Sequence, residues 1–218
     1  YFNAMYSLSD LAIVHGLRGV SNIGGYKKLI SINTILRREV LDAYTNCTNN
    51  IFCILGGGTV NVGSSFLEST IRIAKLCIGA SEYLNEYTIH IVCSSKNIYD
   101  ALNKLKHKEN IILHDRILDT QEYYSKARLI ITRSGRNTLS ELAYLGIPAL
   151  SFLSGCQYRR LEQKQNMEAL ATYNIKPVSL DIKPNKFAEL IKETASINYQ
   201  REVFIPGNHQ AIQEILNL

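Results

Sequence analysis

Two segments of the sequence combine glycine, hydroxyl and carboxylate residues in an order that suits a phosphorylated ligand. Residues 56–65 have the sequence GGGTVNVGSS, and residues 134–141 have the sequence SGRNTLSE. Glycine lets backbone N–H groups come close to an anion, and a helix that starts just after such a loop adds the positive end of its dipole. Each segment follows an apolar run, Ile51–Leu55 or Leu129–Thr132, and precedes an amphipathic one. We therefore predict a strand, a loop and a helix in both places.

The first loop does not match two well-known nucleotide-binding motifs. A Walker A loop requires a lysine after Gly63, where Ser64 stands. A dinucleotide fingerprint requires a third glycine where Asn61 stands, and the next apolar run, Thr88–Cys93, is not followed by a ribose-binding acid. P-loop NTPases and NAD or FAD enzymes are therefore disfavoured. On this loop alone, a tight turn without a ligand and a phosphate site fit equally well.

The second loop leads into a helix that we expect to begin near Thr138. Thr138 and Glu141 have the spacing of a capping box, which would give Glu141 a structural role at the helix start. Contact between Glu141 and a ligand is the alternative, and the two roles are compatible.

A third group of polar residues follows the apolar run Ala149–Leu153. We expect Glu162, Gln163 and Asn166 to lie on one face at the beginning of a helix. Neutral amides suit a hydroxyl-rich ligand, whereas a solvated helix face is the structural alternative.

These segments belong to a repeated pattern that starts at residue 51, in which short β-branched runs alternate with longer amphipathic ones. The pattern predicts an α/β fold, a Rossmann-like parallel sheet with helices on both faces, because strands this apolar are buried on both sides. The expected strands are Ile51–Leu55, Thr88–Cys93, Ile111–Leu113, Leu129–Thr132, Ala149–Leu153 and, more weakly, Pro177–Leu180. The expected helices are Ser65–Cys77, Ile98–His107, Thr120–Lys126, Thr138–Leu145, Leu161–Thr172, Pro184–Ser196 and His209–Leu216.

The front of the chain does not continue this repeat. We expect a strand at Leu11–His15, a glycine-containing loop over Gly16–Gly25, and a linker and helix over Lys27–Tyr44. Residues 1–4 resemble the remains of an expression tag. Residues 5–35 are interpreted as an entry segment or the tail of an N-terminal domain, and residues 36–218 as the α/β domain.

Composition narrows the classes of protein. The net charge is +5, and the 24 basic residues are spread along the chain instead of forming blocks, so nucleic-acid binding is not expected. No apolar run approaches the roughly 18 residues that span a bilayer, and the start has no signal-peptide pattern. The five cysteines form no C-x-x-C pair and are interpreted as reduced, which favours a cytoplasmic protein. The five histidines are interpreted as ordinary residues, not as catalytic bases.

Four motifs in order carry a resemblance to a known family. They are ARLIITRSG at 127–135, T-x-SELA at 138–143, GIPA at 146–149 and EQ-x-x-N at 162–166. Together they resemble the C-terminal, donor-binding domain of family-28 GT-B glycosyltransferases, the MurG-like enzymes, over roughly residues 50–218. The front segments Asp10–Val14 and Gly24–Leu29 look like the domain-crossing part of the same superfamily, which includes the PseG-type nucleotide-sugar hydrolases.

The resemblance implies a Rossmann-like domain over 36–218 that binds a UDP-sugar, and it assigns roles to residues of this sequence. For the diphosphate it implies Gly57, Gly58 and Thr59, with Lys28 in place of a diphosphate-facing arginine. For the α-phosphate it implies Ser134, Gly135 and the N–H groups near Asn137 and Thr138. Glu141 would accept from the ribose hydroxyls, and the backbone near Ile117 would contact the base. For the sugar it implies Gln163 with Glu162 beside it, and Asn166 matches the asparagine of the family motif.

The resemblance also implies three alternative functions. The first is transfer of a sugar such as N-acetylglucosamine from a UDP-sugar to a lipid-linked or glycan acceptor. The second is hydrolysis of a nucleotide sugar, and the third is a non-catalytic donor-binding subunit. No D-x-D motif occurs, which fits a metal-independent GT-B enzyme without a cofactor. The acceptor site and the catalytic base would lie in an N-terminal domain, in the same polypeptide or a separate chain. A lipid-linked acceptor would bring the protein to the cytoplasmic face of a membrane.

Overall fold

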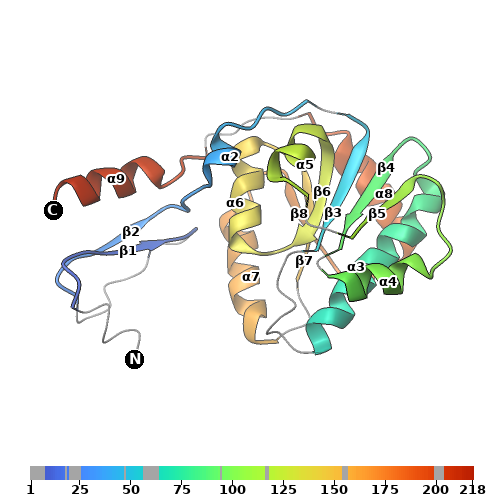
Figure 1. Ribbon diagram of the computed structural model, residues 1–218, viewed down its shortest axis with the longest axis horizontal. Helices are drawn as coiled ribbons and strands as arrows, with labels where there is room; N and C mark the ends of the chain where they lie inside the picture. Colours follow the sequence, from blue (N-terminus) through green and yellow to red (C-terminus); the bar gives the residue numbers. More distant parts are fainter. Residues whose placement is uncertain are drawn as a thin grey trace.

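Six parallel strands form the main sheet of the computed structural model (Figure 1). The structure describes residues 8–17, 19, 26–46, 48–55, 64–93, 95–115, 118–153, 157–198 and 204–218. The strands are β3 (Asn50–Ile54), β4 (Thr88–Val92), β5 (Ile111–His114), β6 (Ala127–Arg133), β7 (Ala149–Phe152) and β8 (Ile175–Val178). They lie in the order β5-β4-β3-β6-β7-β8, so the direction in which strands are added reverses between β3 and β6. This is the strand order of the Rossmann fold, as the sequence predicts.

Helices cover both faces of this sheet because the strands are apolar on both sides. On β3, Ile51 and Cys53 pack into the core under one set of helices, and Phe52 between them packs into the core on the other face. The first set is α3 (Ser64–Ala80), α4 (Lys96–Asn103) and α8 (Pro184–Ala195), with the short 3-10 helix η1 (Ser81–Tyr83) after α3. The second set is α5 (Thr120–Lys126), α6 (Arg136–Leu145) and α7 (Gln157–Ala169).

The boundaries of the predicted elements shift where the sequence signal is local and weak. All six strands of the main sheet are confirmed, with ends that move by no more than two residues. Helix α7 begins at Gln157, four residues before the expected start at Leu161. Its first turn is polar, so the apolar periodicity that marks a helix begins only later in it. Helix α4 ends at Asn103 and does not continue to His107.

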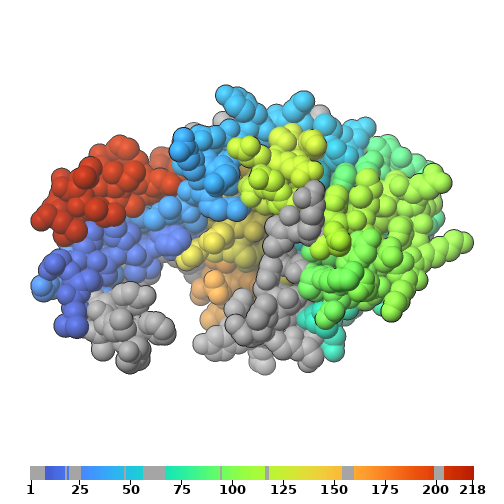
Figure 2. Space-filling model, in the orientation of Figure 1, coloured from blue at the N-terminus to red at the C-terminus, as the bar shows by residue number. Residues whose placement is uncertain are grey.

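A second, smaller unit lies beside the main sheet and contains both early and late parts of the chain (Figure 1). Strands β1 (Ala12–His15) and β2 (Leu29–Ile32) form a parallel pair, and helix α9 (Asn208–Leu216) lies beside them in Figure 1. Lys28, just before β2, forms an ion pair with Glu214 of α9 at 2.9 Å. Figure 2 shows α9 in red and the first strands in dark blue gathered at one end of the molecule.

The expectation of a linker and helix over Lys27–Tyr44 is largely wrong. This segment contains β2 and only one turn of helix, α2 (Arg38–Leu41), which lies against α5. A four-residue strand gives little periodic signal, and its partner β1 is not adjacent to it in the sequence, so local sequence could not identify it.

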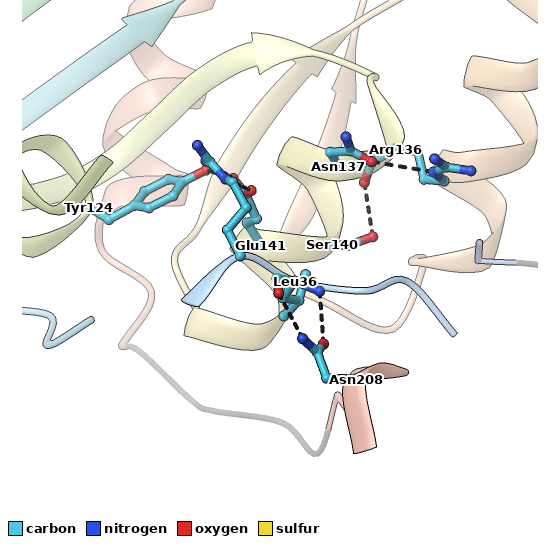
Figure 3. A network of polar contacts seen from close by, with 8 residues as sticks. Leu36, Tyr124, Arg136, Asn137, Ser140, Glu141 and Asn208 are labelled. Carbon is cyan, nitrogen blue, oxygen red and sulfur yellow. Dashed lines mark hydrogen bonds and ion pairs between the residues drawn. The ribbon is translucent and has the colours of Figure 1, made fainter. Parts of the chain in front are cut away.

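Two connecting segments, 33–37 and 204–208, join the small unit to the main sheet, and they run side by side. We call this pair of segments the crossing. The Gly207 N–H donates to the Thr34 carbonyl at 3.0 Å, and the Asn33 amide donates to the Ile205 carbonyl at 2.7 Å. The Asn208 side chain accepts from the Leu36 N–H at 2.9 Å and donates to the Leu36 carbonyl at 2.8 Å (Figure 3). The crossing is therefore held by paired hydrogen bonds between segments far apart in the sequence.

Two expectations from the sequence concern the state of the cysteines and the length of the apolar segments. Cys53, Cys77 and Cys93 are buried free thiols, and burial raises the pKa of Cys93 to about 12. They therefore pack as small hydrophobic residues, as expected. Within the ranges given above, none of the helices has the length and apolar character needed to cross a membrane.

Candidate functional site

The strand order places the carboxyl ends of β3 and β6, which the two predicted loops follow in the sequence, next to each other. Strands β3 and β6 are neighbours, and near their ends Ile54 pairs with Thr132. In an open parallel sheet, ligands bind outside the carboxyl ends of the strands, at the point where the strand order reverses. The Ser134 loop leaves β6 at this point. The glycine loop that follows β3, with Gly57, Gly58 and Thr59, lies outside the described residues, as does Ile117.

The start of helix α6 offers unsatisfied hydrogen-bond donors. Gly135 is its N-cap, and the first intrahelical bond runs from the Leu139 N–H to the Gly135 carbonyl at 3.1 Å. The N–H groups of Arg136, Asn137 and Thr138 precede that bond and therefore have no partner within the helix. Donors of this kind, together with the helix dipole, favour a bound anion. This geometry suits the phosphate role that the resemblance implies for Asn137 and Thr138.

Ser134 has a structural environment that the sequence did not indicate. It is fully buried, its hydroxyl lies 2.8 Å from the Ser151 hydroxyl, and its N–H donates to the Phe152 carbonyl at 3.0 Å. The Asn166 amide donates to the Ser134 carbonyl at 3.3 Å, which ties helix α7 to the end of β6. The Gly135 N–H is also occupied, by the Arg133 carbonyl at 2.7 Å. Any phosphate contact at these two residues would therefore use the close approach of their backbone, not their N–H groups.

The residues Glu162, Gln163 and Asn166 do not lie at the beginning of a helix. They lie in the middle of α7 because the helix starts earlier than expected. Gln163 and Asn166 are buried, whereas Glu162 is exposed. Glu162 thus differs from the other two in its exposure to solvent.

The capping-box interpretation of Thr138 and Glu141 is also wrong. Helix α6 begins at Arg136, two residues before the expected start, and Gly135 occupies the N-cap position. Glu141 therefore lies in the second turn, where it cannot reach back to the N-cap N–H. Its carboxylate has other partners.

The Glu141 carboxylate is buried and bound from two sides. Arg37 donates to it with both arms of its guanidinium, from Nε to Oε1 at 2.9 Å and from Nη2 to Oε2 at 3.1 Å. The hydroxyl of Tyr124, a fully buried residue of α5, donates to Oε2 at 2.6 Å (Figure 3). Burial opposes the charge on Arg37, but hydrogen bonding and attraction to Glu141 outweigh it and raise the pKa of Arg37. Burial and the neighbouring carboxylate also raise the pKa of Tyr124.

No pattern in the sequence indicates that Arg37 and Tyr124 belong to this site. Arg37 is 104 residues away from Glu141 along the chain, and Tyr124 is 17 residues away on another helix. No spacing rule connects such residues, and only the folded chain brings them together.

A cavity of about 240 Å³ opens beside this cluster, and we call it the Glu141 pocket. It brings together three predicted residues of α6 with residues of the crossing and α5. Its lining consists of Asn137, Thr138 and Glu141, together with Ile35, Leu36, Arg37 and Tyr123. A carboxylate, the start of a helix and apolar walls thus meet in one hollow, an arrangement suited to a hydroxylated ligand that also carries negative charge.

Residues 52–209 match the glycosyltransferase family 28 C-terminal domain. The chain belongs to this family. The match includes all six strands of the main sheet, apart from the first two residues of β3, and both predicted loops. No curated protein has a sequence that matches this family-28 domain significantly.

Solved structures of glycosyltransferases share the fold of this family-28 domain. MurG from Acinetobacter baumannii superposes with a TM-score of 0.66 at 17% identity, over 94% of this chain and 66% of MurG. The kitacinnamycin glycosyltransferase superposes with a TM-score of 0.57 at 15% identity, over 78% of this chain and 41% of its own. The glycosyltransferase VinC, solved with dTDP, gives 0.56 at 10% identity, over 88% of this chain and 52% of VinC. The chain thus spans between two fifths and two thirds of these enzymes.

A Gly135→Ala variant of the family-28 domain separates folding from ligand binding. The backbone of Gly135 is extended (φ −77°, ψ 132°), and an added Cβ would meet no atom closer than 4.0 Å, the Arg133 carbonyl oxygen. We expect the free energy of unfolding to fall by no more than about 1 kcal/mol, because alanine is a poorer N-cap than glycine. If a phosphate lies against Gly135, the methyl group should weaken UDP binding by about tenfold or more. Urea denaturation measures the change in stability, and calorimetric titration measures the change in affinity. An unchanged affinity for UDP would show that no phosphate lies against Gly135.

Two histidines occupy a separate hollow of about 320 Å³ on the α5 face of the sheet. His90 Nδ1 lies 3.0 Å from His114 Nε2, and His90 Nε2 lies 3.3 Å from Asn50 Oδ1. The His90 ring stacks on Phe52 with a centroid distance of 4.5 Å. Burial, and then the charge of His114, lower the pKa of His90 to about 4.

This environment predicts a pH dependence of stability. The pKa of His90 falls from 6.5 to about 4 on folding, so the unfolded chain binds the proton first as the pH drops. The free energy of unfolding should therefore decline as the pH falls through this window and stay level above it. A His90→Gln variant should flatten the decline in urea denaturation, whereas His209→Gln, at an exposed position, should not. Equal slopes for wild type and His90→Gln would contradict the assignment.

Proposed function

We propose that this family-28 domain binds the UDP-sugar donor of a glycosyltransferase, with a sugar such as N-acetylglucosamine. One observation carries the proposal: the Glu141 pocket adjoins the free N–H groups at the start of α6, where the strand order reverses. A buried carboxylate suits sugar hydroxyls, and helix N–H groups suit phosphates. Membership of the family and the fold shared with MurG support the same ligand.

The donor would lie across the carboxyl ends of β3 and β6. The N–H groups of Asn137 and Thr138 would face the α-phosphate beside Ser134 and Gly135, and Glu141 would accept from the ribose. The remaining contacts follow the family pattern: Gly57, Gly58 and Thr59 at the diphosphate, Ile117 at the base, and Glu162, Gln163 and Asn166 at or near the sugar. Backbone N–H groups and cationic side chains would stabilise the leaving diphosphate, a role that metal ions fill in other transferases.

The partner of this domain would be an acceptor-binding N-terminal domain, in the same polypeptide or in a separate chain. Helix α9 exposes Ile212, Ile215 and Leu216, and strands β1 and β2 pair only with each other among the described residues. Exposed apolar side chains beside a two-stranded sheet are typical of an interface with another domain. The catalytic base would belong to that domain. We further propose a cytoplasmic protein that contacts the membrane only through a lipid-linked acceptor.

Thermal unfolding with added nucleotides tests the proposal. UDP or UDP-N-acetylglucosamine at a hundredfold excess over Kd should stabilise the chain by about 2.7 kcal/mol, which raises Tm by about 5 to 10 °C. No shift with any nucleotide or nucleotide sugar would refute donor binding. Release of free sugar without an acceptor would support a hydrolase instead of a transferase. Binding without turnover, even with the acceptor-binding domain present, would support a non-catalytic subunit.

A further inference from the structure

Arg37 reaches the Glu141 pocket from the crossing, which joins the small unit to the main sheet. It is the last residue of the first segment of the crossing, and its side chain is 53% exposed, whereas that of Glu141 is only 5% exposed. Its guanidinium donates a hydrogen bond to each of the two carboxylate oxygens, which fixes the plane of the carboxylate as well as its position. Tyr124 holds the same carboxylate from the interior.

We propose that Arg37 is a positioning residue for the donor: it fixes the Glu141 carboxylate for the ribose and makes donor binding depend on the crossing. The inference rests on the proposed function, since it takes the ribose as the ligand of Glu141.

The hydrogen bonds to the Glu141 carboxylate leave one acceptor position open for the donor. A carboxylate has about four acceptor positions, two on each oxygen. The three bonds from Arg37 and Tyr124 fill both positions on Oε2 and one on Oε1. One position on Oε1 stays open, so a ribose hydroxyl can bind to Glu141 while Arg37 remains in place.

The position of Arg37 depends in turn on the C-terminal segment of the crossing. Asn208 binds both backbone groups of Leu36, the residue before Arg37. Two residues earlier, Thr34 accepts from the Gly207 N–H, and its hydroxyl lies 3.0 Å from the Ser140 hydroxyl on α6. A movement of the small unit that opened these contacts would withdraw Arg37 and leave Glu141 buried without its counter-charge. A buried carboxylate without its counter-charge is unfavourable, so the donor site and the crossing should stabilise each other.

The decisive comparison is between UDP and a uridine diphosphate that lacks both ribose hydroxyls. Calorimetric titration of the full chain should show that the wild type prefers UDP by about tenfold or more, because a hydrogen bond to a charged group is lost with the analogue. In Arg37→Met, UDP affinity should fall by about tenfold while that of the analogue stays the same, so the preference nearly disappears. Arg37→Lys keeps the positive charge but lacks the planar guanidinium that donates to both carboxylate oxygens, so its preference for UDP should be intermediate.

Two further variants serve as matched tests. Arg38→Met removes the neighbouring arginine, which is 90% exposed and forms an ion pair with Asp42, and it should behave as wild type. Asn208→Ala changes no residue that lines the pocket, but it releases Leu36 and should reduce the preference for UDP as Arg37→Met does. If Arg37→Met weakens both ligands equally, or neither, Arg37 has only a structural role and the inference is overturned. If the wild type binds no uridine nucleotide at all, the proposed function fails instead. If Arg37→Met does not fold, the ratio of the affinities for UDP and for the analogue is measured in Arg37→Lys and Asn208→Ala instead, and it decides in the same way.

Discussion

A Glu141→Gln variant should bind UDP about tenfold to a hundredfold more weakly than the wild-type chain, because the open acceptor position loses its charge. Glutamine has nearly the same shape, so the cavity stays filled. Its amide nitrogen, however, must face a donor of Arg37 or Tyr124, both of which now point at the carboxylate. We therefore also expect the free energy of unfolding to fall by about 1 to 3 kcal/mol. Urea denaturation and calorimetric titration at the same pH give the two numbers.

Tyr124→Phe is the matched control for this prediction. It removes one hydrogen bond to Glu141 and keeps the aromatic packing of a fully buried side chain. It should lower stability by about 1 to 2 kcal/mol and weaken UDP binding far less than Glu141→Gln does. If both variants lose similar stability and both keep full affinity for UDP, Glu141 is a structural residue and not a ligand of the ribose.

A Gly207→Ala variant should open the crossing. A Cβ at Gly207 would lie 2.2 Å from the Asn33 carbonyl oxygen and 3.0 Å from its carbon, so backbone must move. That movement would break the bond from the Gly207 N–H to the Thr34 carbonyl. Overpacking against backbone costs about 3 kcal/mol. We expect hydrogen exchange over residues 204–218 to accelerate strongly, while exchange in the main sheet changes little.

Ala211→Gly provides a comparison for this effect, since it perturbs α9 one turn later without a clash against the crossing. It should weaken α9 by about 1 kcal/mol, the intrinsic cost of glycine in a helix. Protection of residues 204–208 should persist in Ala211→Gly and be lost in Gly207→Ala. Equal protection in the two variants would mean that the crossing tolerates the added methyl group.

The main sheet could be predicted from the sequence because its signals are local. Each strand is a short apolar run such as Ile51–Leu55, and each is followed by an amphipathic helix, so the parallel sheet follows from the alternation alone. Strand β2 could not be predicted in this way, because it is short and is defined by its pairing with β1. Helix starts were misplaced where the first turn is polar, as in α7.

The candidate site was predictable only in part, for the same reason. Asn137, Thr138 and Glu141 come from one continuous motif, and the structure places all three in one pocket. Of the two roles that the sequence leaves open for Glu141, the helix cap is wrong, because the local pattern gives no sign that Gly135 takes the N-cap position. Arg37 and Tyr124 could not be linked to Glu141 by any spacing, since tertiary contacts alone join them.

The crossing also has a consequence for biosynthesis. Its contacts join residues 172 positions apart, and the Lys28–Glu214 pair spans 186 positions. During translation, the six-stranded sheet can form as soon as β8 emerges, but Leu36 has to wait for Asn208. Contacts of such high sequence separation form slowly, because the chain between them must be ordered first. A nascent chain would therefore contain a folded main sheet before the crossing has formed and fixed the position of Arg37. The donor binding proposed above would therefore have to wait for residues 204–208, after the main sheet has formed.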